Sequence, residues 1–164
     1  MQRANAVVGS VLFLAVAPGT IAGLIPWWIT GWRGPLAPLP LAILGGLLIA
    51  GGGWLLLECF GRFALQGRGT PAPIAPPERL VVTGPYRRVR NPMYVAVTSL
   101  ILGQAALFAD PKLLIYGLVI WAAFHVFVLV FEEPTLRQTF PQDYAAFCAA
   151  VPRWIPRLRP WRPS

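Results

Sequence analysis

Two short polar clusters in this chain carry side chains able to bind a charged ligand. The first is the stretch 79–94, which reads RLVVTGPYRRVRNPMY and holds four arginines, an asparagine and two tyrosines. The second is the pair Glu132 and Glu133, which follows a long apolar run. Carboxylates at the end of a membrane helix are costly unless cations compensate them. Together the clusters predict either an interfacial Arg–Glu network or a site for a ligand that carries both signs of charge.

The elements that hold these clusters are strongly apolar. Of 164 residues, 56% are hydrophobic and only 12% are charged, and the mean hydropathy is +0.60. A soluble domain carries about a quarter charged residues. The net charge of +8 is concentrated between apolar runs, which favours a membrane protein facing anionic lipid over a nucleic-acid-binding protein. We therefore expect a single all-α integral membrane domain, since this length suits one domain.

Four apolar segments are long enough, or nearly so, to cross a bilayer, which needs about 20 residues. The first is too long for the apolar core of a signal peptide, so we expect a retained helix, kinked at Pro18. The second carries small residues at Ala42, Gly46 and Ala50, a spacing that lets helices approach closely. The predicted spans are 6–29, 41–60, 92–109 and 111–131, separated by a polar loop over 61–91 and followed by a tail over 133–164.

Prolines mark the helix boundaries of the second half of the chain. Asn91-Pro92 and Asp110-Pro111 each combine a good capping residue with a proline at the first helical position. The third and fourth spans therefore form a tight antiparallel hairpin. Pro134 disfavours helix at the residue before it, so we expect the chain to leave the fourth span at Glu132 and Glu133.

Positive charge predicts the topology. Of 14 lysines and arginines, only Arg33 and Lys112 fall on the side opposite to the loop and the two termini. The positive-inside rule then places both termini and the loop 61–91 in the cytoplasm, and we expect the cytoplasmic membrane of a bacterium. This topology brings the stretch 79–94 and the glutamate pair to adjacent ends of one hairpin.

After the fourth span, Pro141 is expected to open a short helix. Its apolar positions, Tyr144, Phe147, Cys148 and Val151, follow the helical period and predict one buried face. The tail PRWIPRLRPWRPS is typical of an interfacial anchor. The two cysteines of the chain have neither metal-ligand spacing nor a disulfide pattern.

His125 is the only histidine and lies within the fourth span, seven residues before Glu132. On a regular helix the two side chains would face nearly the same way. An ionisable residue in a membrane span suggests a functional site, and His125 is the candidate catalytic residue. If the acceptor must lose a proton, His125 or Glu132 is the candidate base. The alternative is a neutral histidine hydrogen-bonded to a neighbouring helix, and the sequence leaves both open.

The segments GPYRRVRNPMY and EEPTLRQTFPQDYAAFCAAVPRWIP, with an apolar hairpin between them, resemble the isoprenylcysteine carboxyl methyltransferase and phospholipid methyltransferase superfamily. These are integral membrane enzymes that use S-adenosylmethionine, and the resemblance covers about residues 78–156. Asn91 stands where the family has histidine, and Ala96 where it has glycine. The residues that the resemblance assigns to the cofactor are Leu80, Val81, Tyr86, Arg90, Asn91, Pro92, Met93, Tyr94, Glu132 and Glu133.

The resemblance implies methyl transfer from S-adenosylmethionine to a lipophilic acceptor at the cytoplasmic face. Glu132 or Glu133 would accept from the amino group or ribose, and Arg90 or a backbone amide would take the carboxylate. The pocket is expected under the cytoplasmic end of the hairpin, capped by the C-terminal segment. Val128 and Leu129 occupy the region where prenylcysteine enzymes carry a basic residue, so the acceptor stays open. The alternatives are a nicotinamide-dependent membrane reductase and a non-catalytic membrane scaffold.

Overall fold

The computed structural model describes residues 3–62 and 80–162, and every regular element in these two ranges is helical. The first half of the predicted loop 61–91, with its prolines, lies outside the described residues. The elements are α1 (Arg3–Gly19), η1 (Thr20–Leu24), α2 (Ile25–Thr30), α3 (Leu39–Arg62), η3 (Gly84–Arg87), α4 (Pro92–Phe108), α5 (Pro111–Phe127), η4 (Val128–Glu132), α6 (Glu133–Thr139) and α7 (Pro141–Ala150). The predicted all-α class is confirmed.

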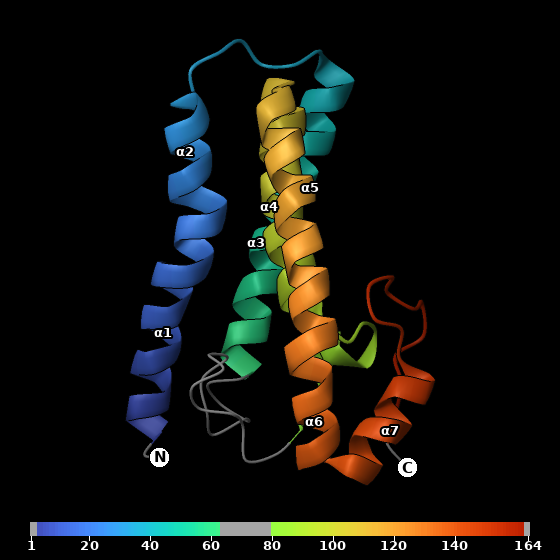
Figure 1. Ribbon diagram of the computed structural model, residues 1–164. Helices are drawn as coiled ribbons and strands as arrows, with labels where there is room; N and C mark the ends of the chain where they lie inside the picture. Colours follow the sequence, from blue (N-terminus) through green and yellow to red (C-terminus); the bar gives the residue numbers. More distant parts are fainter. Residues whose placement is uncertain (1–2, 63–79, 163–164) are drawn as a thin grey trace.

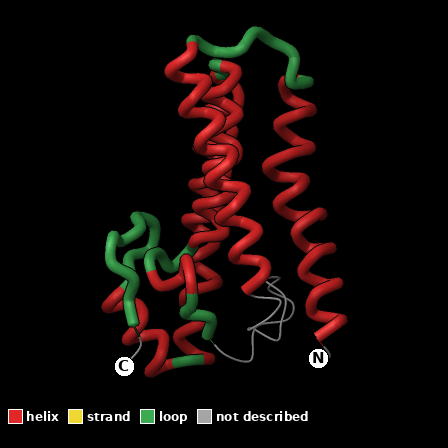
Figure 2. Tube along the Cα trace, turned by 180° about the vertical axis from the view of Figure 1, so that it is seen from behind, coloured by secondary structure: helices red, strands yellow, loops and turns green. Residues whose placement is uncertain are grey.

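Long helices make up most of the molecule (Figure 1). The segments Val11–Thr30, Leu39–Arg62 and Pro111–Thr139 are each long and apolar enough to cross a membrane, and Pro92–Phe108 is a shorter apolar helix. Seen from both sides, the two termini and α7 gather at one end of the bundle (Figures 1 and 2). The chain is therefore an integral membrane protein whose polar C-terminal part lies at that end, which we call the α7 end.

Two π-helical turns carry long helices past prolines. In η1 the Ile25 N–H donates to the Thr20 carbonyl, and in η4 the Glu133 N–H donates to the Val128 carbonyl, each five residues back. A proline stands at the second position after each turn, Pro26 after η1 and Pro134 after η4. Proline lacks a donor and clashes with the carbonyl four residues before it, and the wider turn accommodates both defects.

The fourth span consequently continues to Thr139. The prediction that the chain leaves the helix at Glu132 and Glu133 is wrong, because the five-residue hydrogen bond of η4 keeps the backbone helical through Pro134. In the first span Pro18 stays within α1, and the irregular turn η1 begins two residues after it.

Close packing of α3 on α4 sets the centre of the bundle. A Cβ atom on Gly45 would lie 2.6 Å from the backbone nitrogen of Leu107, and one on Gly52 would lie 2.9 Å from the Ala96 carbonyl oxygen. A Cβ on Gly46 would meet nothing within 4 Å. The sequence predicts that Ala42, Gly46 and Ala50 make this contact. The structure displaces the small-residue face by one position, so that Gly45 makes the contact and Gly46 does not.

The hairpin of α4 and α5 follows the sequence expectation. Ala109 takes a left-handed conformation with φ of 47°. The Asp110 carboxylate then accepts from the backbone N–H groups of Lys112 at 2.8 Å and Leu113 at 3.4 Å. This side chain cap starts α5 immediately after α4 ends.

The short helix α7 packs its predicted apolar face into a small core. Tyr144, Phe147 and Val151 are buried against Cys59 of α3 and against residues of the segment before α4. The aromatic ring of Trp161, near the end of the described chain, packs on Phe147 with ring centroids 5.7 Å apart. The predicted face of the C-terminal helix is confirmed.

The C-terminal segment, residues 151–162, returns along the segment 84–91. The backbone N–H of Arg90 donates to the Pro152 carbonyl at 2.9 Å. In the other direction, the backbone N–H of Arg157 donates to the Arg88 carbonyl at 2.9 Å, and that of Trp161 donates to the Arg87 carbonyl at 2.8 Å. The sequence predicts an interfacial anchor for this tail, but much of it is held by backbone hydrogen bonds to the protein itself. This pairing fixes the position of the loop that leads into α4.

Candidate active site

A cavity of about 460 Å³ lies near the α7 end, between α1, α3, α4 and α5. This volume is in the range of small-molecule sites, about 300–1,000 Å³. Most of its wall is apolar, and the polar side chains are Tyr86, Arg90, Asn91, Tyr94 and Glu132. The lining residues are Phe13, Ala17, Pro18, Ile21, Leu56, Phe60, Tyr86, Arg90, Asn91, Pro92, Met93, Tyr94, Val97, Ala123, Phe124, Phe127 and Glu132.

The cavity therefore joins the two polar clusters of the sequence. The turn before α4 requires Gly84, whose φ of +55° is left-handed, and it leads through η3 to Tyr86, which lines the cavity. The second cluster arrives with η4, whose Glu132 faces the same space. Among the residues that the structure describes, none that follows Glu132 lines this cavity, and the C-terminal segment packs on residues 87–91 instead. The cap by the C-terminal segment stays a prediction.

Glu132 meets a tyrosine rather than an arginine. The Tyr94 hydroxyl donates to Glu132 Oε2 at 2.7 Å, and the Tyr94 ring lies against Phe124 with centroids 4.7 Å apart. Within the described part of the chain, no ion pair is formed by Glu132. A carboxylate in a mostly apolar cavity with only one neutral donor favours a ligand that brings a cation or further hydrogen-bond donors.

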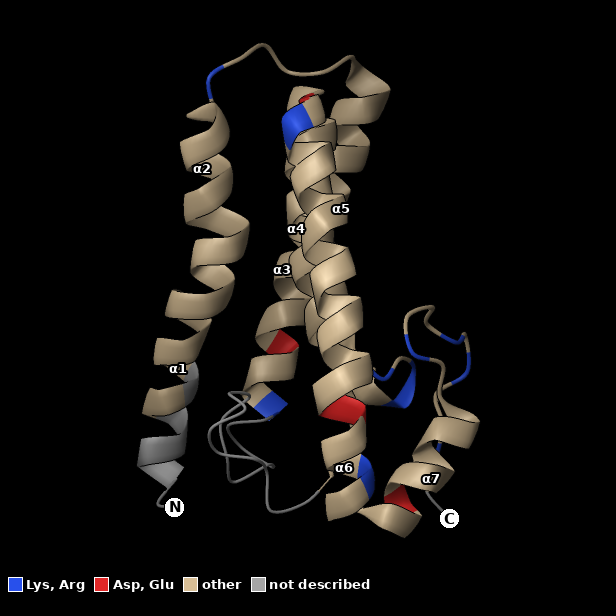
Figure 3. Cartoon of the chain, viewed as in Figure 1, with Lys and Arg blue, Asp and Glu red and all other residues tan. Residues whose placement is uncertain are grey.

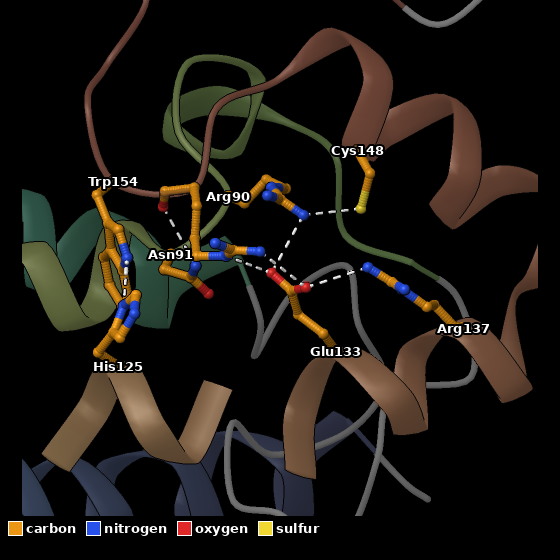
Figure 4. Close-up of polar contacts among 8 residues, drawn as sticks. Arg90, Asn91, His125, Glu133, Arg137, Cys148 and Trp154 are labelled. Atoms are coloured by element: carbon orange, nitrogen blue, oxygen red, sulfur yellow. Dashed lines mark hydrogen bonds and ion pairs between the residues drawn. The ribbon is translucent and has the colours of Figure 1, made fainter. Parts of the chain in front are cut away.

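Glu133 is the centre of a separate ion-pair network (Figure 4). Its carboxylate lies 2.6 Å from Arg153 Nε, 3.2 Å from Arg90 Nη1 and 3.3 Å from Arg137 Nη2. The Glu133 side chain is only 5% exposed, and it does not line the cavity. The hydrogen bond to Glu133 raises the pKa of the Arg153 guanidinium above its ordinary value. The predicted Arg–Glu network thus forms around one of the two glutamates.

Arg90 connects the network to the cavity. Its Nη1 donates to the Cys148 sulfur at 2.8 Å and pairs with Glu133 (Figure 4). Its Nε is buried and has no hydrogen-bond partner among the described residues. Because Arg90 also lines the cavity, it is the cationic side chain placed to meet an anionic group of a ligand there.

Asn91 occupies the expected capping position but its side chain does not cap α4. The Asn91 Nδ2 donates instead to the Arg153 carbonyl oxygen at 3.2 Å. The predicted side-chain cap is wrong because the C-terminal segment offers this acceptor across the loop. Asn91 therefore links the cavity wall to the C-terminal segment, whose Arg153 also pairs with Glu133.

His125 lies outside the cavity. Its Nδ1 accepts from the indole N–H of Trp154 at 3.0 Å, and its ring stacks on Trp121 with centroids 5.4 Å apart. The expectation that His125 and Glu132 share one face is wrong, because the π turn η4 between them takes more residues per turn than an α-helix. His125 is hydrogen-bonded within the protein, as the alternative expects, but its partner Trp154 belongs to the C-terminal segment and not to a neighbouring helix.

The other predicted cofactor residues fall in two places. Pro92 and Met93 line the cavity, as does Tyr86, whose pKa is raised by burial. Val81 is 8% exposed and belongs with Leu80 to the core under α7. Those two residues therefore support the site through packing and do not line the cavity.

Sequence reasoning missed the opposite wall of the cavity. Phe13 of α1 and Phe60 of α3 stack with centroids 6.1 Å apart and both line it. Neither residue stands in a polar pattern, so no local signal marks it. Arg153 was also missed, because its place in an Arg-, Trp- and Pro-rich tail indicated a membrane contact and not a partner for Glu133.

Comparison with known proteins identifies one family. The family model described as phospholipid methyltransferase matches residues 41–143, which is more than half of the chain and contains both polar clusters. A search of curated proteins found no match. The match covers α3, α4, α5, η4 and α6 together with the cavity residues that these elements contribute.

Proposed function

The chain belongs to the phospholipid methyltransferase family, and on that basis we propose that it transfers a methyl group from S-adenosylmethionine to a lipophilic acceptor at the cytoplasmic face of the membrane. Family membership makes it a membrane methyltransferase acting on a lipid-like substrate. The observation that carries the proposal is the cavity, which combines an apolar wall with Glu132 and Arg90 at one end.

The polar side chains of the cavity fit the charges of S-adenosylmethionine, which has a sulfonium, an amino group and a carboxylate. Glu132 has no arginine partner among the described residues and suits the amino group or the ribose hydroxyls. The guanidinium of Arg90, which lines the cavity, suits the carboxylate. The rings of Tyr86 and Tyr94 suit the adenine or the sulfonium, whose contact with an aromatic face is favourable by about 0.5–2 kcal/mol.

When bound, this group supplies a methyl already activated by the positive sulfur. The chain mainly provides proximity and alignment, an effect of up to about 7–11 kcal/mol. Its apolar wall, with Phe13, Phe60 and Phe127, excludes water from the charged end and accepts the apolar part of the acceptor. An acceptor dissolved in the bilayer would reach the cavity sideways, between the helices that border it.

Among the described residues that line the cavity, Glu132 is the candidate for a general base. His125 is hydrogen-bonded outside it, whereas Glu132 lines it. We therefore assign to Glu132 the role that the sequence left open between these two residues, for acceptors that must lose a proton. A thiolate or carboxylate acceptor needs no base, and the role of Glu132 is then to bind the donor.

The distribution of charge supports the cytoplasmic placement. Most arginines of the described chain gather at the α7 end, where the cavity lies, whereas Arg33 and Lys112 lie at the other end (Figure 3). The positive-inside rule orients such a chain with the cavity toward the cytoplasm. Labelling of cysteines introduced at each end in intact cells measures this orientation.

The function is tested by transfer of a tritiated methyl group from S-adenosylmethionine into a membrane lipid extract. The purified full chain should label a species that partitions into organic solvent, which mass spectrometry then identifies. A parallel arm supplies NADPH and follows its oxidation with the same extract. Oxidation of NADPH without methyl transfer would support the alternative hypothesis of a membrane reductase. Inactivity of a folded protein in both arms would support the hypothesis of a non-catalytic membrane scaffold.

A further inference from the structure

The π turn η1, together with Pro26, takes the regular helical donor away from two backbone carbonyls. In a regular α-helix the Ile21 carbonyl accepts from the residue four positions on, but the Ile25 N–H donates to Thr20 instead. Pro26 has no N–H, so it can serve neither Ile21, five residues back, nor Ala22, four residues back. An unpaired carbonyl inside an apolar bundle costs free energy, so both carbonyls need other donors.

Both carbonyls accept hydrogen bonds from side chains of the hairpin formed by α4 and α5. The Tyr116 hydroxyl on α5 donates to Ile21 at 2.8 Å, and Gln104 Nε2 on α4 donates to Ala22 at 2.7 Å. Gln104 is only 8% exposed, and its Oε1 accepts from the indole N–H of Trp32 at 3.0 Å. These side chains therefore link the first span to the hairpin at two consecutive carbonyls and again after α2.

The linked turn also belongs to the wall of the cavity. Ile21 lines the cavity, and so do Phe13 and Ala17, which precede it at four-residue intervals and therefore fall on one helix face. The first span lies to one side of the other long helices (Figures 1 and 2). The seating of η1 on the hairpin thus sets the distance between this wall and the cavity residues of α5, Phe124 and Phe127.

We propose that Gln104 and Tyr116 are positioning residues that set the width of the cavity and so select the acceptor by the size of its apolar part. Neither residue lines the cavity, and both act through the carbonyls of Ile21 and Ala22. In an apolar pocket one methylene changes discrimination by about tenfold or more, so a small displacement of this wall changes which acceptors fit. The size selection rests on the proposed function, whereas the link between the helices does not.

The first measurement tests the link without any activity. Gln104→Met removes the donor at a similar side-chain length and should lower the midpoint of unfolding in sodium dodecyl sulfate. Pro26→Ala supplies a backbone N–H that can reach either carbonyl. In that background the shift caused by Gln104→Met should shrink by about a third or more, since one of the three hydrogen bonds of Gln104 is then replaced. An equal shift in both backgrounds would overturn the proposal.

Thr98→Val is the matched control on α4. Its hydroxyl has no partner within the described part of the chain, and Thr98 is not among the residues that line the cavity. This variant should therefore not lower the midpoint of unfolding.

The second measurement uses the methyl-transfer assay with the membrane lipid extract. Mass spectrometry gives the lengths of the apolar chains in the labelled species. Gln104→Met, and Tyr116→Phe with its ring retained, should each change the ratio of longer to shorter labelled species by about threefold or more. Both variants should keep the wild-type affinity for S-adenosylmethionine, because the charged end of the cavity is untouched. Thr98→Val should keep the wild-type ratio, and unchanged ratios in the other two variants would refute the size selection.

The two measurements distinguish a failure of this proposal from a failure of the proposed function. If the folded wild type transfers no methyl group, the proposed function fails and the size selection fails with it. The unfolding midpoints then still decide whether Gln104 replaces the donor that Pro26 lacks. If methyl transfer occurs but both variants lose affinity for S-adenosylmethionine, the substitutions act on the whole fold and the positioning role is refuted.

Discussion

At the scale of single residues, two adjacent glutamates have different surroundings. Glu133 is enclosed by Arg90, Arg137 and Arg153, whereas Glu132 meets only the Tyr94 hydroxyl among the described hydrogen-bonding groups. The sequence predicted that the pair would meet the basic stretch, and it could not assign the partners. A helix turns by about 100° per residue, so the two carboxylates point in different directions, and only the packed structure decides which one meets the arginines.

Glu133→Gln should destabilise the protein. The change leaves the 10% exposed Arg90 without its carboxylate, and loss of one partner of a buried pair costs about 3–5 kcal/mol. We expect about 2–3 kcal/mol, since Arg137 and Arg153 are partly exposed and screened. Unfolding in sodium dodecyl sulfate measures the loss. A stability equal to that of the wild type would contradict the assigned network.

Tyr94→Phe should weaken binding of S-adenosylmethionine and also lower the stability of the free protein, because the Glu132 carboxylate loses its donor. The ring and its contact with Phe124 remain, and only the hydrogen bond that orients Glu132 is lost. A bond to a charged group contributes about 1.5–3 kcal/mol, so we expect roughly a tenfold or greater rise in Kd by titration calorimetry.

Tyr116→Phe is the control for that substitution. The Tyr116 hydroxyl donates to the Ile21 carbonyl at 2.8 Å, and Tyr116 is not among the residues that line the cavity. This variant should bind S-adenosylmethionine like the wild type. A similar loss in both variants would argue for a general effect on the fold.

At the scale of elements, the boundaries were predictable and the irregular turns were not. Asn91-Pro92 and Asp110-Pro111 start α4 and α5 as expected. The π turns escaped prediction because a proline locally disfavours helix, and the five-residue hydrogen bond that rescues the helix has no residue pattern of its own. The turn η4 also rotates Glu132 away from His125, which no regular periodicity shows.

The glycine face of α3 gives a prediction at the same scale. Gly45→Ala places a Cβ atom 2.6 Å from the backbone of α4, and overpacking of this kind costs about 1–3 kcal/mol. Gly46→Ala meets open space and should be neutral or slightly stabilising. Unfolding of the two variants in parallel measures the difference, and equal stabilities would contradict the observed packing of α3 on α4.

At the scale of the whole molecule, the cavity is assembled from parts that are distant in the chain. The resemblance in the sequence covered the two polar clusters, and these supply the charged end. The apolar wall comes partly from α1, through Phe13 and Ala17, and from η1, through Ile21. Both elements lie outside that stretch and outside the family match. Apolar side chains of membrane helices face either lipid or a cavity, and composition does not distinguish these two environments.

The C-terminal segment should hold the loop that forms part of the cavity wall in place. Deletion of residues 151–164 removes Arg153 from Glu133 and the backbone partners of Arg87, Arg88 and Arg90. We expect faster hydrogen exchange in residues 84–91 and weaker binding of S-adenosylmethionine, although none of the deleted residues that the structure describes lines the cavity. Unchanged exchange in that segment would show that the loop holds its conformation alone.

The central claim is that the cavity beside Glu132 binds the methyl donor. Titration calorimetry of the purified full chain with S-adenosylmethionine tests it most directly, with Glu132→Gln as the variant. Glu58→Gln is the matched control, because Glu58 pairs with Arg62 at 2.5 Å on α3 and is not among the lining residues. The account predicts binding in the wild type and in Glu58→Gln, and at least a tenfold loss in Glu132→Gln, as expected for a charged hydrogen bond. Equal affinity of all three proteins, or no binding by the folded wild type, would contradict it.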